Sequence, residues 1–154
     1  MPPTPSIARD VEVQKLDVRA RLIAQHEQIR AAARLCLERA RGRIGEPISD
    51  ELDQALTRLR SEFWDHDKTE TALMREILTR SRRSPEQVER MIEDHTADHA
   101  VLWAELSRPA RHVIARIEEV CVMLEAHMVG EERTFLSENR FELRTRGTTP
   151  PPRA

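Results

Sequence analysis

Five of the six histidines and two glutamates stand at positions where the helical pattern of the chain places buried residues. They are His26, His66, Glu70, His95, His99, His127 and Glu131. Burying that many titratable groups costs several kcal/mol unless hydrogen bonds or a bound cation satisfy them. Imidazole nitrogen and carboxylate oxygen are ligands that suit iron or manganese, and also zinc. The residue types therefore predict a metal site inside the protein.

The spacing of these residues is suited to joint binding of a metal. His66 and Glu70, His95 and His99, and His127 and Glu131 are each four residues apart. Residues at that spacing lie on one face of a helix, so each pair can present two donors to one centre. Seven ligands exceed the four of a tetrahedral zinc site, which favours two ions. Two octahedral ions have about twelve coordination positions. Five imidazoles fill about five of them, two bridging carboxylates about four, and a bridging oxo or hydroxo group about two. Roughly one position is left open for another ligand.

Four predicted helices, at about 8–41, 49–81, 85–107 and 110–138, must position these groups. The glycines and proline of "GRIGEP" form a turn between the first two helices. Ser84 and Gln87 form a capping-box motif, with Pro85 at the first position of the third helix. Pro109 marks the third connection. Four helices with short connections predict an all-α, antiparallel up-down-up-down four-helix bundle.

Steps of four and three residues define the predicted inward face of each helix. In the second segment this face comprises Leu52, Leu56, Leu59, Phe63, His66, Glu70, Leu73 and Ile77. In the fourth segment it comprises Val113, Ile117, Val120, Leu124, His127, Glu131 and Phe135. His112 falls beside this face and is predicted to lie on the surface. Trp64 and Trp103 each adjoin an inward position, where they either flank the core or line the metal pocket.

The composition narrows the class of protein. The chain has 154 residues and a net charge of −2, which implies neither nucleic-acid binding nor attraction to an anionic membrane. It contains no run of about 20 apolar residues, and its start lacks the apolar stretch of a signal peptide. Two cysteines are too few for a disulfide framework, so we expect a cytoplasmic protein. We expect one domain at 7–141, with a disordered leader at 1–6 and a disordered proline-rich tail at 142–154.

Together, His26, "HDKTE", "HTADH" and "HMVGEE" resemble the hemerythrin-like, HHE cation-binding domains over about Ile7 to Phe141. The resemblance implies a four-helix bundle that holds a non-haem di-iron centre. The ligands it implies are His26, His66, Glu70, His95, His99 and His127. The last carboxylate has two candidates. Oxygen-carrying hemerythrins have an aspartate at the position of Glu132, whereas many HHE members have a glutamate at the position of Glu131, and the inward periodicity favours Glu131.

Several functions fit such a centre. The first is a module that binds oxygen or nitric oxide for sensing, storage or scavenging, and the single open position supports it. The alternatives are a di-iron enzyme that processes hydrogen peroxide or oxygen, and an iron-handling protein, including one in which metal serves only folding. The chain has no tyrosine, so no tyrosyl radical can form. Its ligand set is also richer in nitrogen than the glutamate-rich set of ferritin-like di-iron proteins, which favours binding over oxidation.

Overall fold

The computed structural model describes residues 5–43, 45–79, 82–134 and 136–137, with side chains from Val18 onward. Its elements are α1 (Pro5–Ala40), α2 (Asp50–Thr79), α3 (Pro85–Leu106), α4 (Ala110–Ala115) and α5 (Ile117–Arg133). These described residues contain no strand, so the predicted all-α class is confirmed. The predicted tail at 142–154 lies outside the described residues, as does the predicted leader except for Pro5 and Ser6, which begin α1.

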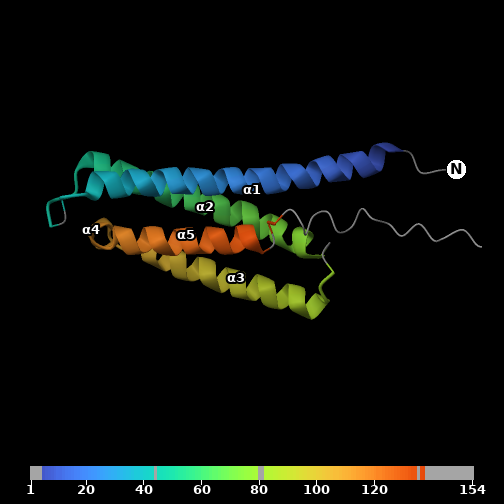
Figure 1. Ribbon diagram of the computed structural model, residues 1–154. Coiled ribbons are helices and arrows are strands. Elements are labelled where there is room, and N and C mark those ends of the chain that lie inside the picture. The colour runs from blue at the N-terminus through green and yellow to red at the C-terminus, as the bar shows by residue number, and fades with distance from the viewer. Residues whose placement is uncertain (1–4, 44, 80–81, 135, 138–154) are drawn as a thin grey trace, which may run out of the picture.

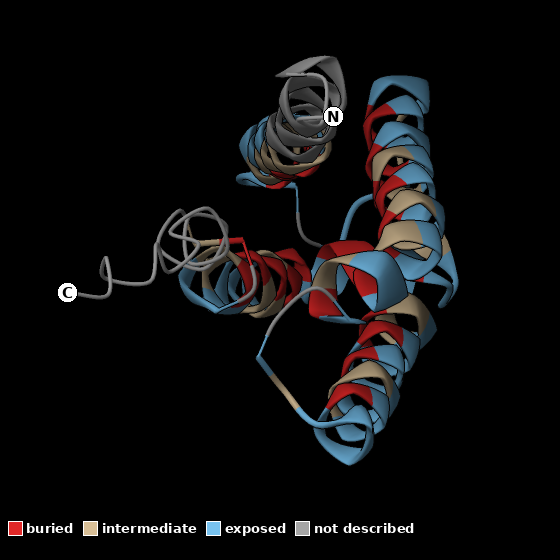
Figure 2. Cartoon of the chain, turned by 90° about the vertical axis from the view of Figure 1, so that its right-hand side faces the viewer, coloured by how far each residue is buried: buried red, intermediate tan, exposed pale blue. Residues whose placement is uncertain are grey.

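The long helices pack in pairs around a shared interior. Helix α1 contacts α2 and α5, while α3 contacts the same two helices from the other side. In Figure 1, α1 and α2 lie side by side above α5 and α3, and the short α4 lies at the end where α5 begins. The end-on view in Figure 2 shows buried residues on the inward sides of these helices. None of the described helices has the length and apolar character needed to cross a membrane.

The starts of α2 and α3 follow from local sequence. Ser49 Oγ accepts a hydrogen bond from the backbone N–H of Leu52 at 3.2 Å, and acidic residues fill the first turn of α2, where they suit the helix dipole. At α3, the backbone N–H of Gln87 donates to Ser84 Oγ at 3.2 Å, and the N–H of Ser84 donates to Gln87 Oε1 at 3.0 Å. The predicted capping box with Pro85 is therefore confirmed.

The predicted continuous helix at 110–138 is wrong, because the chain bends at Arg116. The backbone N–H of Arg116 bonds to the carbonyl of Val113, three residues back, at 3.1 Å, and this tighter turn separates α4 from α5. The Arg116 side chain also contacts Glu105 of α3 at 2.9 Å and Glu119 of α5 at 2.6 Å. These ion pairs tie the bend to the neighbouring helix. Helix α5 then ends at Arg133, five residues before the predicted end.

The core consists of two apolar clusters with the polar residues between them. Along each long helix, one cluster lies before the polar positions and the other after them. The larger cluster includes Ile29, Leu59, Phe63, Leu102 and Leu124. The smaller cluster consists of Leu22, Met74, Leu78, Val88 and Leu136. The polar side chains therefore have an apolar cluster on either side of them along the helices.

The inward face of α2 departs from the prediction after Glu70. The buried residues there are Met74 and Leu78, whereas the predicted Leu73 and Ile77 are only half-buried. An α-helix has 3.6 residues per turn, so successive steps of four rotate the buried stripe slowly around the helix. The steps from His66 through Glu70 to Met74 and Leu78 are all four residues long.

Candidate metal centre

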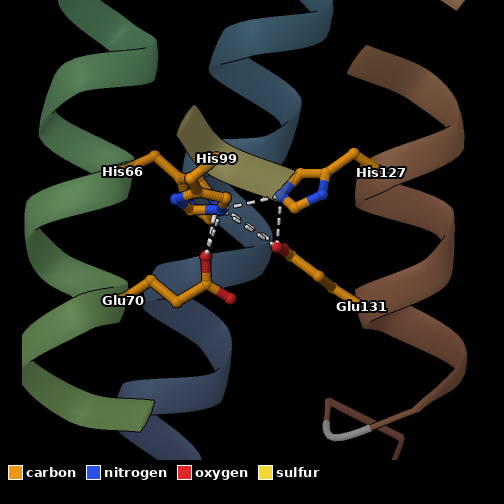
Figure 3. A group of neighbouring side chains, drawn as sticks. All are labelled: His66, Glu70, His99, His127 and Glu131. Carbon is orange, nitrogen blue, oxygen red and sulfur yellow. Dashed lines mark hydrogen bonds and ion pairs between the residues drawn. The ribbon is translucent and has the colours of Figure 1, made fainter. Parts of the chain in front are cut away.

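Each long helix contributes polar side chains to one interior cluster. Helix α1 supplies His26, and the other three helices each supply a pair of residues four apart: His66 and Glu70 from α2, His95 and His99 from α3, and His127 and Glu131 from α5. Figure 3 shows five of these side chains pointing toward one another. Ligand atoms of His66, Glu70, His99, His127 and Glu131 all lie within 4.8 Å of one another. The structure thus brings together all seven groups that the sequence places on the inward face.

The carboxylate of Glu131 lies between two sets of histidines. Its Oε2 atom is 2.8 Å from His26 Nε2 and 3.5 Å from His66 Nε2. The distances from its Oε1 atom to Nε2 are 2.5 Å for His127, 3.4 Å for His99 and 3.6 Å for His95. The two oxygens therefore have different histidine neighbours. We call His26 and His66 the two-histidine set, and His95, His99 and His127 the three-histidine set.

Glu70 is the second carboxylate that contacts both sets. Its Oε2 atom lies 3.0 Å from His66 Nε2 in the two-histidine set. The same oxygen lies 2.9 Å from His95 Nε2 and 3.2 Å from His99 Nε2 in the three-histidine set. Glu70 and Glu131 reach the cluster from different helices, α2 and α5. Every histidine Nε2 in the cluster therefore faces at least one carboxylate oxygen.

The donor atoms fit a cation better than they fit one another. Nδ1 of His66 and Oε1 of Glu70 form no hydrogen bond with a described residue, although both side chains are completely buried. Leaving such a group unsatisfied costs roughly 1–3 kcal/mol. Metal–nitrogen and metal–oxygen bonds are about 2.1 Å long, so neighbouring ligands at right angles lie about 3.0 Å apart. The distances around Glu70 Oε2 are close to that spacing.

The electrostatics of the cluster favour positive charge at its centre. Burial opposes protonation of His66, but its contacts with Glu131 and Glu70 outweigh burial and raise its pKa to about 9. The pKa of His99 is likewise lowered by burial but raised to about 10 by Glu131, Glu70 and Asp67. Burial raises the pKa of Glu70, and contacts with His66 and two other histidines lower it to about 2. Without metal, protons supply the positive charge that a cation would bring.

Two imidazoles of the three-histidine set also face each other directly. The Nε2 atoms of His99 and His127 are 2.7 Å apart. Two nitrogen lone pairs at that distance repel unless a proton or a cation lies between them. Burial raises the pKa of Glu131, but contacts with His127, His26 and other histidines lower it well below its usual range. The carboxylate is therefore ionised and available as a ligand.

Glu132, the alternative candidate for the last ligand, lies outside the cluster. Its Oε1 atom is 2.9 Å from Nδ1 of His26, on the opposite side of that ring from Glu131, and 2.9 Å from Arg30 Nη1. Asp67 holds a similar position, because its Oδ1 atom contacts Nδ1 of His99. Sequence reasoning missed Asp67, which directly follows a ligand candidate but falls beside the inward face. The one feature of the sequence that could have drawn attention to Asp67 is its position directly after His66.

Phe63, rather than either tryptophan, adjoins the histidines. The centre of its ring lies 5.5 Å from that of His99, and the ring of Trp103 stacks on Phe63 with its centre 6.1 Å away. Trp64 packs against Trp103 at 5.2 Å and is 42% exposed. The two tryptophans thus flank the core behind Phe63. His112 is exposed, so its predicted surface position is confirmed.

Comparison of the chain with protein-family models, with curated proteins and with solved structures found no match. The fold and the site by themselves define a class: an all-helical protein with a buried cluster of histidines and glutamates that could hold a metal ion.

Proposed function

We propose that the chain is an antiparallel up-down-up-down four-helix bundle that holds two iron ions, and that the ions bind a diatomic molecule. The position of Glu131 carries this proposal. Its two oxygens face a two-histidine set and a three-histidine set, as expected of a carboxylate that bridges two ions. Glu70 contacts both sets as well and would be the second bridge. Because the two oxygens have different histidine neighbours, each oxygen could bind a different ion.

The donor chemistry supports iron. All candidate ligands are imidazole nitrogens or carboxylate oxygens. Such ligands suit iron, whereas soft metals prefer thiolate sulfur. Cys36 is buried in the larger apolar cluster, and Cys121 packs against the same cluster. The Cys121 thiol contacts the backbone carbonyl of Ala33 at 3.7 Å rather than a ligand candidate. No thiolate therefore competes for the metal among the described side chains.

The burial of the cluster favours a very small ligand. His26, His66 and Glu70 are completely buried, whereas the side chains of His95 and His127 are each 9% exposed. The three-histidine set is therefore the part of the cluster nearest to solvent. Ferrous ions bound here would supply open coordination positions and electrons to a molecule such as oxygen or nitric oxide. Phe63 and the two apolar clusters keep bulk water away from the inner side.

The surroundings favour binding over rapid turnover. A peroxide-processing enzyme needs a group that delivers protons to the reacting oxygen atoms. The two additional carboxylates next to the cluster are Asp67 and Glu132, and each is held by the outer nitrogen of a histidine. Neither lies on the inner side of the histidine rings. Binding of a diatomic gas without rapid turnover would serve sensing, storage or scavenging equally well.

Reconstitution with iron tests the proposal. Chelator-treated protein is incubated anaerobically with ferrous iron, freed of excess metal, and analysed for iron before addition of nitric oxide or oxygen. We expect two iron ions per chain and a persistent new visible band on gas addition. His127→Gln should lose the second ion, whereas His112→Gln, a matched change at an exposed histidine, should not. One ion per chain would contradict the binuclear site, and continuous rapid consumption of hydrogen peroxide would identify an enzyme.

A further inference from the structure

Two carboxylates outside the cluster each contact the outer nitrogen of one histidine. Glu132 Oε1 lies 2.9 Å from Nδ1 of His26, and Asp67 Oδ1 contacts Nδ1 of His99. His26 belongs to the two-histidine set and His99 to the three-histidine set. Each set therefore contains at least one histidine whose far side is held by a carboxylate. In both cases the Nε2 atom faces Glu131.

We propose that Glu132 and Asp67 are positioning residues, one for each metal position. This inference rests on the proposed binding of two ions. A neutral imidazole carries its proton on one nitrogen and its lone pair on the other. When Nδ1–H donates to a carboxylate, the lone pair is fixed at Nε2, and the ring is held in the orientation that a metal needs. The added negative charge also makes Nε2 a stronger electron donor.

Glu132 is itself held rigidly enough to orient a neighbour. Arg30 Nη1 donates to Glu132 Oε1 at 2.9 Å, and the same guanidinium contacts both oxygens of Glu125 at 2.8 and 3.0 Å. Glu132 and Arg30 are partly buried, at 28% and 15% exposure. Burial raises the pKa of Glu132, but Arg30 and His26 lower it, so the carboxylate is ionised at neutral pH. Its charge and position are thus both fixed by contacts across α1 and α5.

His66 provides a contrast within the same set. Its Nδ1 atom is buried and forms no hydrogen bond with a described residue. The ring is held by packing, including the rings of His26 at 4.8 Å and Phe63 at 6.5 Å. Within the two-histidine set, only His26 therefore has a carboxylate partner on its outer side among the described residues. We expect the outer carboxylates to matter more for metal affinity than for folding.

Glu125 offers a matched control for Glu132. Both glutamates are on α5 and both bind Arg30, but only Glu132 contacts a histidine. Asp65 serves in the same way for Asp67, because it is an exposed aspartate two residues earlier on α2. If the salt bridges had a purely structural role, or if only net charge mattered, each variant and its control would bind metal with the same affinity.

The test is anaerobic titration of the full chain with cobalt(II), followed by visible absorption. We expect wild-type protein to bind two equivalents, and Glu132→Ala to weaken one binding step by about 10- to 100-fold, the usual effect of removing such a partner. Glu132→Gln should lose less affinity, because its amide oxygen still accepts from Nδ1–H. Asp67→Ala should weaken the other step. Glu125→Ala and Asp65→Ala should resemble wild type.

Two outcomes separate the possible failures. If wild-type protein binds fewer than two equivalents, the proposed function fails before the variants are considered. If it binds two, and Glu132→Ala matches Glu125→Ala in both binding steps, the positioning role is refuted. Circular dichroism checks that each variant is folded, and Glu132→Gln, which keeps the size of the side chain, provides a second test if Glu132→Ala is not. In iron-loaded protein, the same Glu132→Gln change should raise the reduction potential, because it removes a negative charge near one ion.

Discussion

The stability of the metal-free protein should fall as the pH rises from 6.5 to 9. In the folded chain the pKa of His66 is about 9, against 6.5 for an unperturbed histidine, and that of His99 is about 10. A group whose pKa is raised by folding stabilises the folded state fully below its unfolded pKa. That contribution is lost as the pH rises through the folded pKa. The histidines therefore stabilise the metal-free fold fully below pH 6.5, and this contribution is lost near pH 9 for His66 and near pH 10 for His99.

The size of the effect follows from the shift in pKa. One pKa unit corresponds to about 1.4 kcal/mol, so the shift of His66 corresponds to roughly 3 kcal/mol. His99 contributes in the same direction, but the two effects are not additive because both histidines face Glu70 and Glu131. A loss on the order of 3 kcal/mol is a large part of the stability of a typical domain.

Urea denaturation in the presence of a chelator measures this loss. Unfolding is followed by circular dichroism at pH 6.5, 7.5, 8.5 and 9. Measurements stop at pH 9 because burial, with a smaller effect from Cys121, raises the pKa of Cys36 to about 11 and adds a thiol contribution above that pH. His112→Gln removes an exposed histidine and should leave the profile unchanged, whereas His66→Gln should flatten it. A free energy of unfolding that stays constant or rises over this range would refute the electrostatic account.

Three further predictions concern the metal and the helices. The Glu131→Ala variant should bind fewer than two equivalents of iron, and with lower affinity, because the change removes the oxygens that contact both histidine sets. Iron analysis after gel filtration measures this loss. Iron at 100 times its dissociation constant should raise the free energy of unfolding by about 2.7 kcal/mol, seen as a higher Tm, whereas equal Tm values would mean that iron does not prefer the folded state. Ser84→Ala should lower stability by about 1 kcal/mol in urea titrations through loss of the α3 cap, without changing iron content.

The helices and the inward polar groups were predictable because one signal encodes both. Steps of three and four residues locate the buried face, and His66, Glu70 and Glu131 stand on it together with leucines. The same periodicity favours Glu131 over Glu132, and the structure places Glu131 inside the cluster and Glu132 outside it. The capping box at Ser84 is likewise a local pattern that needs no tertiary information.

The remaining features depend on contacts between distant segments. The bend at Arg116 is associated with ion pairs to Glu105 of α3 as well as to a neighbour on α5, and no local motif marks it. The partnership of Asp67 with His99 joins α2 to α3, and that of Glu132 with His26 joins α5 to α1. Charged residues make up 34% of the chain. In such a sequence, an acidic residue outside the inward face that contacts a histidine looks the same as one that faces solvent.

The central claim is that two ions lie on either side of Glu131. Crystals of iron-loaded protein, measured at wavelengths above and below the iron absorption edge, locate the metal directly. The account predicts two anomalous peaks in each chain, one beside His26 and His66 and the other beside the three-histidine set, with Glu131 between them. A single peak that all five histidines share, or peaks away from these side chains, would contradict it.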